Sequence, residues 1–167
     1  MACLGVHFSL SADEVEQLRS IEDDADRVEH LHAVIEEVYF ANHRARLAES
    51  DKAWDAMHRT LTDGELTFDG GEYPLNHVVL GGEQLYSGDD FIMALKTPEQ
   101  VRDVARVLPG ITETEFRERY SAVDPESYGY PKSDEDFEYT WSSFQDVREF
   151  WLHAASEGRF VLFTVDQ

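Results

Sequence analysis

The sequence predicts an α+β fold in which a small mixed β-sheet of three or four strands is flanked by several helices. Short apolar segments at residues 3–10, 91–96 and 160–165 have the length and composition of buried strands. The intervals between them carry helix start signals and apolar residues at helical spacing. No internal repeat or flexible linker divides the 167 residues, so a single domain over residues 1–167 is expected.

The N-terminal region is expected to begin with a strand and to continue with helices. Residues 3–10 alternate large apolar residues with small or polar ones, which is typical of a strand. Ser11 and Glu14 have the spacing of a capping box, so a helix is predicted to begin at Ser11. A second helix is predicted over residues 24–48. Its apolar residues recur at intervals of three and four and are Val28, Leu31, Ile35 and Val38.

Residues 51–62 are predicted to form a third helix with two distinct stripes. At about 100° per residue, its apolar side chains fall on one stripe. They are Trp54, Met57 and Leu61. The polar side chains fall on a neighbouring stripe and are Asp51, Asp55, His58 and Thr62. This helix would anchor in the core through its tryptophan and present a histidine between carboxylates beside it.

The rest of the chain is predicted to alternate helices with the two remaining strands. The predicted helices cover residues 75–80, 97–108, 112–120 and 134–156. The clearest start signal is Thr97-Pro98, because Gln100 completes a capping box there. Residues 124–133 are expected to be a loop rich in Tyr, Gly and Pro. The strand at 160–165 is expected in the centre of the sheet, since both of its faces are apolar.

The charge of the chain is strongly acidic. Asp and Glu number 35 against 14 Lys and Arg, which gives a net charge of −21. Such a surface repels phosphate backbones and anionic lipids, so neither nucleic acid nor a membrane is expected as a partner. The plain interpretation is a well-solvated surface, and the sharper one is a surface that docks on a basic partner.

Cysteine usage and hydropathy indicate a cytoplasmic protein. Cys3 is the only cysteine, which excludes an intramolecular disulfide and a cysteine-based zinc site. No apolar run reaches the roughly 18 residues of a transmembrane helix. The N-terminus shows no basic region followed by an apolar stretch, so no secretory signal is expected.

Several blocks of sequence are distinctive when they are taken in order. The first is Asp51–His58, followed by Leu61-Thr62. The later blocks are Pro74-Leu75, Val79-Leu80-Gly81-Gly82, Leu95 with Thr97-Pro98 and Val101, Phe116 with Tyr120, Tyr130-Pro131, and Phe144, Phe150, Ala154-Ala155, Gly158 and Val161-Leu162. Together they resemble the YfbM-like family, small bacterial proteins of unknown function. The resemblance covers nearly the whole chain and implies a single-domain α+β fold and a cytoplasmic bacterial protein, without implying an activity.

His58 is the leading candidate for chemistry. On the predicted helix it lies within one turn of Asp55 and shares a stripe with Asp51. A carboxylate that orients an imidazole is an arrangement used in general-base catalysis. The competing interpretation is a partly buried histidine whose ring N–H meets a carboxylate or a backbone carbonyl. This second interpretation is favoured, because no G-x-S-x-G nucleophile motif is present.

Neither a metal site nor a cofactor is predicted. His30 and His32 lie about 200° apart on a helix, so they cannot hold one ion together. Pairs of ligands at helical spacing, such as His32 with Glu36, are too few for zinc. The glycine pairs Gly70-Gly71 and Gly81-Gly82 lack the spacing of phosphate-binding loops.

Two loop regions carry amphipathic side chains that are common in binding sites. These side chains are Tyr73 and His77 in the first region and Tyr128 and Tyr130 in the second. Such groups on loops commonly bind ligands, and they also commonly cover a small core. Together with Trp54 and His58 of the adjacent helix, they are predicted to line a ligand pocket.

Three functions are compatible with these features. The favoured one is a non-catalytic binding or protein-interaction module, whose partner is a protein or a small molecule and for which the charge suits a basic partner. The first alternative is a small hydrolase or transferase that uses His58 with Asp51 or Asp55. The second alternative is an acidic, immunity-like inhibitor of a basic toxin.

Overall fold

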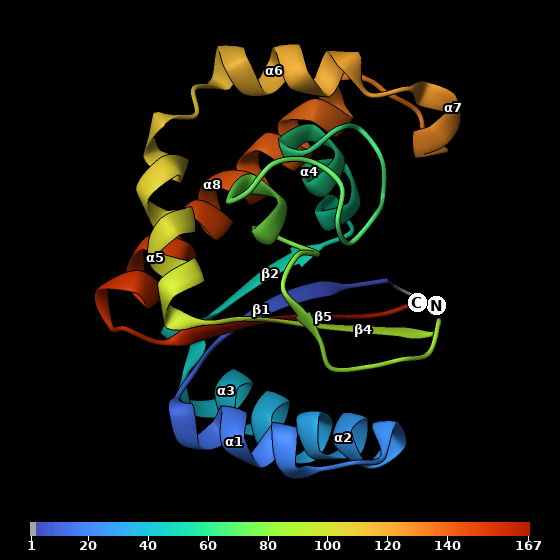
Figure 1. The fold of residues 1–167 in the computed structure, drawn as a ribbon. Coiled ribbons are helices and arrows are strands. Elements are labelled where there is room, and N and C mark those ends of the chain that lie inside the picture. Colours follow the sequence, from blue (N-terminus) through green and yellow to red (C-terminus); the bar gives the residue numbers. More distant parts are fainter. Residues whose placement is uncertain (1–2) are drawn as a thin grey trace.

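The computed structural model describes residues 3–167 and is built around an antiparallel sheet (Figure 1). Its strands are β1 (Gly5–Leu10), β2 (Leu47–Asp51), β3 (Glu83–Gln84), β4 (Phe91–Lys96) and β5 (Phe160–Asp166). Their order across the sheet is β2-β1-β5-β4-β3. The α+β class is therefore confirmed. The sheet itself differs from the prediction, because within residues 3–167 it has five strands and every neighbouring pair is antiparallel, so it is not mixed.

The two strands that the sequence did not predict, β2 and β3, form the opposite edges of the sheet. In β2, buried and exposed residues alternate from Ala48 to Asp51, and β3 consists of two exposed residues. Short polar edge strands lack the apolar run by which central strands are recognised in a sequence. β5 pairs with β1 on one side and with β4 on the other, so its predicted central position is confirmed.

Helices cover both faces of the sheet (Figure 1). One face packs against α1 (Ala12–Ser20), α2 (Asp24–His30), the π-helix η1 (Leu31–Glu36) and α3 (Glu37–Asn42). The other face packs against α4 (Ala53–Leu61), α5 (Pro98–Val107) and α8 (Asp134–Ser156). The helix α6 (Glu113–Ala122) packs on α4 and α8, and α6 and α7 (Pro125–Tyr128) lie farther from the sheet (Figure 1). Short 3-10 turns lie at η2 (Arg44–Arg46), η3 (Leu75–His77) and η4 (Leu108–Gly110). Each face has its own apolar core.

The helix predicted over residues 24–48 is shorter and less regular than expected. It ends at Asn42 and passes through the π-helix η1. The wider π-helical turns bring Leu31, Ile35 and Tyr39 into the core at intervals of four residues and leave Val38 exposed. The last part of the predicted helix contributes instead to η2 and to the edge strand β2.

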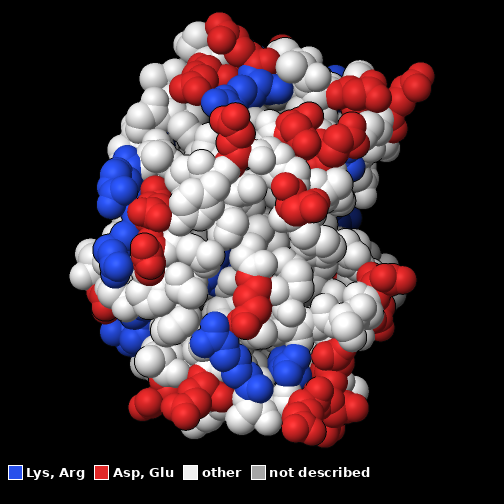
Figure 2. Space-filling view, in the orientation of Figure 1, with Lys and Arg blue, Asp and Glu red and all other residues white. Residues whose placement is uncertain are grey.

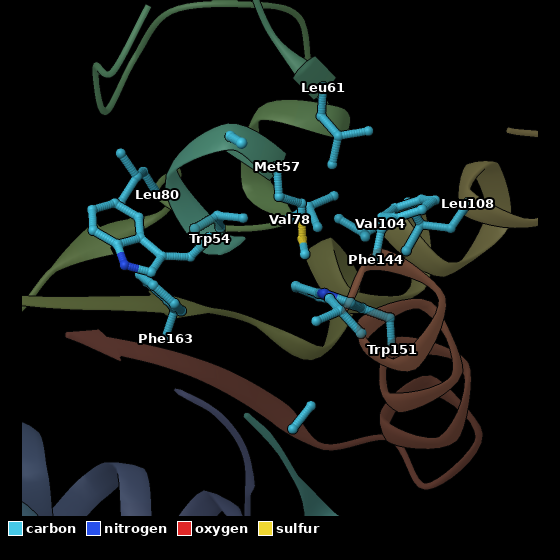
Figure 3. Packing of buried hydrophobic residues seen from close by; sticks show 14 of the residues in the cluster. Trp54, Met57, Leu61, Val78, Leu80, Val104, Leu108, Phe144, Trp151 and Phe163 are labelled. Carbon is cyan, nitrogen blue, oxygen red and sulfur yellow. The ribbon is translucent and has the colours of Figure 1, made fainter. Parts of the chain in front are cut away.

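The helix predicted over residues 51–62 begins two residues later, at Ala53. Asp51 is the last residue of β2 and has a φ of 44°, the left-handed conformation that turns the chain from the strand toward α4. The predicted apolar stripe is correct, since Trp54, Met57 and Leu61 are all buried in the core (Figure 3). The predicted polar stripe is wrong at Asp51, which is exposed and not part of the helix.

The C-terminal helices follow their start signals closely. Thr97 forms the predicted capping box with Gln100 at the start of α5, and Ser133 caps α8. The short helix expected over residues 75–80 is reduced to the 3-10 turn η3. The expected loop at 124–133 contains the short helix α7, which Asp124 caps.

Candidate binding pocket at the start of α4

A pocket of about 210 Å³ lies beside the start of α4. Its lining comes from five parts of the chain and consists of Cys3, Lys52, Trp54, Asp55, Leu66, Tyr130 and Gln167. We call it the Trp54 pocket. Cys3 and Gln167, which are far apart in the sequence, meet in this lining. Three residues that the sequence proposed for a ligand site or for catalysis, Trp54, Asp55 and Tyr130, meet here.

Trp54 is the fixed wall of the pocket. Its side chain is buried and its Nε1 donates a hydrogen bond to the Cys3 carbonyl at 3.0 Å. The indole packs against Phe163 of β5, with 5.8 Å between ring centroids (Figure 3). A Cβ at Gly5 would lie 2.8 Å from Trp54 Cδ1, so the absence of a side chain at Gly5 makes room for the ring. The tryptophan thus ties α4 to β1 and β5.

Asp55 is held by an arginine rather than by a histidine. Its Oδ1 accepts a hydrogen bond from Arg59 Nε at 2.7 Å. Within residues 3–167, Oδ2 of Asp55 accepts no hydrogen bond. Burial raises the pKa of Asp55 above its usual value, while the hydrogen bond from Arg59 acts in the opposite direction. One carboxylate oxygen is therefore available to a ligand.

Arg59 is a residue of this region that the sequence reasoning missed. Its guanidinium is almost completely buried and also donates to Gly64 O at 3.2 Å and to Ser127 Oγ at 2.9 Å. These bonds connect α4 to the chain segment that contains Tyr128 and Tyr130. The spacing of Asp55 and Arg59, four residues apart on a predicted helix, was the available signal for the ion pair.

The two tyrosines after α6 have different roles. Tyr128 is buried and donates to the Asp136 carboxylate, 3.2 Å from each oxygen. Tyr130 is 59% exposed and lies 5.4 Å from Tyr128 between ring centroids. Tyr128 is therefore part of the core beneath this segment, and Tyr130 forms the solvent-exposed side of the pocket wall.

His58 does not lie at the rim of a hollow, as the catalytic hypothesis required. It is 1% exposed, and its Nε2–H donates to the Thr67 carbonyl at 2.8 Å. Burial lowers the pKa of His58 to about 4. Asp55 pairs with Arg59, and Asp51 lies on β2 rather than on α4, so neither carboxylate orients the imidazole. His58 is therefore the buried, carbonyl-bonded histidine of the competing interpretation.

Tyr73 and His77 are not part of the Trp54 pocket. Tyr73 Oη donates to Asp103 Oδ2 at 2.6 Å, and its ring meets His77 edge-on with 5.0 Å between centroids. Burial lowers the pKa of His77, which is half-buried. The structure therefore separates these two residues from Trp54, Asp55 and Tyr130, although the sequence grouped them as one ligand site.

Two further buried basic residues, His7 and Lys96, were not singled out by the sequence. His7 Nε2–H donates to Val78 O at 2.7 Å, and Lys96 Nζ donates to Val79 O. Gln84 Nε2 donates to the next carbonyl, Leu80 O, at 2.9 Å. Three side chains from the sheet thus satisfy three successive carbonyls of a buried irregular segment, which explains why polar residues are tolerated there.

None of the helices within residues 3–167 is long and apolar enough to cross a membrane. No group of three or more His, Cys, Asp or Glu in that range is arranged to hold a metal ion.

The sequence matches the profile of a domain of unknown function, DUF1877, over residues 1–164. The chain belongs to the DUF1877 family. Among solved structures, this DUF1877 protein is similar to the crystal structure of YfbM from Escherichia coli, a protein of unknown function. The TM-score is 0.67 at 20% sequence identity, over 97% of this chain and 99% of that chain. The likeness confirms the fold and the resemblance to YfbM-like proteins. A search of curated proteins finds no match.

Proposed function

We propose that this protein is a non-catalytic binding module whose ligand occupies the Trp54 pocket. The observation that carries the proposal is the convergence of Trp54, Asp55 and Tyr130, from separate segments, on one pocket. A rigid aromatic wall, an open carboxylate oxygen and an exposed tyrosine are typical components of a small binding site. The volume of about 210 Å³ is below the range of about 300–1,000 Å³ of drug-sized ligand sites, so the pocket suits one small molecule or one side chain.

The environment of His58 supports binding over catalysis. A general base needs access to the proton that it removes, and His58 is sealed in the core with its Nε2 bonded to a carbonyl. Its lowered pKa of about 4 makes it a weak base near neutral pH. These features favour the binding module over the hydrolase or transferase alternative.

The charge of −21 supports a partner or ligand that carries a basic group. On the face shown in Figure 2, Asp and Glu are spread widely and Lys and Arg are fewer. The immunity-like alternative depends on this same charge and stays a prediction. A cytoplasmic location in a bacterium is part of the proposal, supported by the likeness to YfbM from Escherichia coli.

Nuclear magnetic resonance of the full ¹⁵N-labelled chain against a library of small polar and aromatic compounds tests the proposal. We expect shifts to gather at the Trp54 indole N–H and at the amides of Lys52, Asp55 and Leu66, which line the pocket. Tyr130→Ala should weaken these responses. Tyr73→Ala removes an exposed tyrosine outside the pocket and should leave them unchanged. A library in which no compound shifts the pocket resonances would contradict the proposal.

A further inference from the structure

The charged residues that line the Trp54 pocket, Lys52 and Asp55, have opposite signs. Lys52 is exposed and forms no ion pair with any carboxylate of the described residues. Asp55 uses only Oδ1 in its pair with Arg59, and its Oδ2 is not hydrogen-bonded within residues 3–167. The pocket therefore offers one unused cation and one unused carboxylate oxygen.

The start of α4 adds to the positive side of the pocket. Lys52 occupies the N-cap position, and no side chain caps the first turn of this helix. The unsatisfied amide groups of a first helical turn carry positive potential and favour a negative group nearby. The first turn also contains Asp55, so the Lys52 ammonium is the direct partner that the pocket offers to an incoming carboxylate.

The remaining lining is suited to an apolar group. Trp54, Leu66 and Tyr130 supply aromatic and aliphatic surface, and Trp54 is held in place by its bond to Cys3 O. A volume of about 210 Å³ leaves room for a ligand of the size of one amino acid but not for a nucleotide-sized cofactor.

We propose that the Trp54 pocket binds a free amino acid with an apolar side chain in its zwitterionic form. Its carboxylate pairs with Lys52, its ammonium pairs with Oδ2 of Asp55, and its side chain packs on Leu66 and Tyr130. A ligand that carries an ammonium group but no carboxylate would leave Lys52 unpaired and would be repelled by its positive charge. A ligand with only a carboxylate would meet Asp55 and a protein of net charge −21. This inference rests on the proposed function and names its ligand class.

The test compares three matched probes by titration of the full chain: L-leucine, N-acetyl-L-leucine and L-leucinamide. The reporter is the resonance of the Trp54 indole N–H, which is hydrogen-bonded at the pocket wall. L-Leucine should cause a saturable shift. Each analogue lacks one charge of the zwitterion, so its dissociation constant should be larger than that of L-leucine by about tenfold or more. If either analogue binds as tightly as L-leucine, or if L-leucine does not bind, the proposal is overturned.

Two substitutions test the assigned contacts. Lys52→Met keeps the length of an exposed side chain, and Asp55→Asn keeps an oxygen that can accept from Arg59. Each should weaken L-leucine binding about tenfold, because each removes one charge-assisted contact. Tyr73→Ala serves as the matched control and should not change the affinity. L-Leucine affinity that is unaffected by both charge substitutions would overturn the assignment.

The two proposals can fail separately. If library compounds shift the Trp54 pocket while L-leucine does not, the binding module stands and the amino-acid ligand is wrong. If neither the library nor L-leucine shifts the pocket, the binding function itself is wrong.

Discussion

Three basic side chains, His7, His58 and Lys96, lie almost completely inside the protein. Each bonds to a backbone carbonyl and none of them forms an ion pair within residues 3–167. Burial lowers the pKa of His7 to about 3 and of His58 to about 4, and it holds the pKa of Lys96 well below its usual value. A neutral imidazole or amine still donates a hydrogen bond, so these residues serve the fold as donors.

His58 should make the protein sensitive to mild acid. Below pH 6.5 the unfolded chain gains a proton at this histidine, whereas the folded chain does not gain it until the pH approaches 4. Folding stability from His58 is therefore complete above pH 6.5 and falls by about 3 kcal/mol as the pH drops to 4. Urea unfolding at pH 7 and pH 5 measures the loss of folding stability between these pH values, which should be smaller for His58→Gln than for the unmodified protein.

The control for this prediction is His153→Gln. His153 is exposed on α8, so this variant removes a histidine without changing the core. An identical loss of stability between pH 7 and pH 5 in the unmodified protein and in His58→Gln would contradict the buried, neutral histidine.

Lys96 should also make folding stability rise with pH, but over a higher pH range than His58. The unfolded chain holds the lysine proton up to its ordinary pKa of 10.5, and the folded chain releases it earlier because the amine is buried. Stability therefore rises with pH up to 10.5. Lys96→Met leaves Val79 O without its donor, at a cost of about 1–3 kcal/mol, and removes this rise. Urea unfolding at pH 6 and pH 9 measures the stability that Lys96→Met loses relative to the unmodified protein, and this loss should be larger at pH 9. A loss that is the same at both pH values would count against the lowered pKa.

At the scale of elements, α4 connects the sheet to the pocket. Its apolar stripe enters the core through Trp54, Met57 and Leu61. On its other side, Arg59 bonds to Asp55 and to Ser127 just before the tyrosine segment. One nine-residue helix therefore both anchors in the core and carries part of the pocket wall.

Trp54→Ala should cost about 3–5 kcal/mol of folding stability, the range for large aromatic truncations in a core. The indole is 3% exposed, and its removal would also leave the Cys3 carbonyl without its donor. Denaturant midpoints of the two proteins measure the difference. Tyr130→Ala is the aromatic control, and its 59% exposure predicts a change within about 0.5 kcal/mol. Equal midpoints for Trp54→Ala and the unmodified protein would mean that the indole does not support the core.

At the scale of the whole molecule, the charge is the dominant feature. Five of the ion pairs within residues 3–167 join two exposed side chains, and such pairs contribute little individually. With 35 acidic against 14 basic residues, most carboxylates face repulsion from others of the same sign. Self-repulsion of this kind opposes the compact state and is screened by salt.

Raising sodium chloride from low concentration to about 0.5 M should therefore stabilise the protein. We expect a gain of roughly 1 kcal/mol, which corresponds to about 2–4 °C in the thermal midpoint for a chain of this size. Differential scanning calorimetry at fixed pH measures it. A midpoint that falls with added salt would show that attractive surface pairs outweigh the repulsion.

Particular residues show how far sequence reasoning reached. Thr97 with Gln100 and Ser11 with Glu14 predicted helix starts correctly, because a capping box depends only on neighbours in the chain. β2 escaped prediction, since Leu47–Asp51 becomes a strand only through pairing with β1. Asp51 was misassigned for the same reason, as its left-handed φ belongs to the end of that edge strand.

Local periodicity and neighbouring residues are enough to predict the α+β class, the three central strands, the caps and the buried stripe of α4. The pairing of Asp55 with Arg59, the enclosure of His58 and the position of Tyr130, rather than Tyr73, beside Trp54 follow from the folded arrangement of the chain. Such contacts join distant segments, and burial selects among partners that are equally plausible in the sequence.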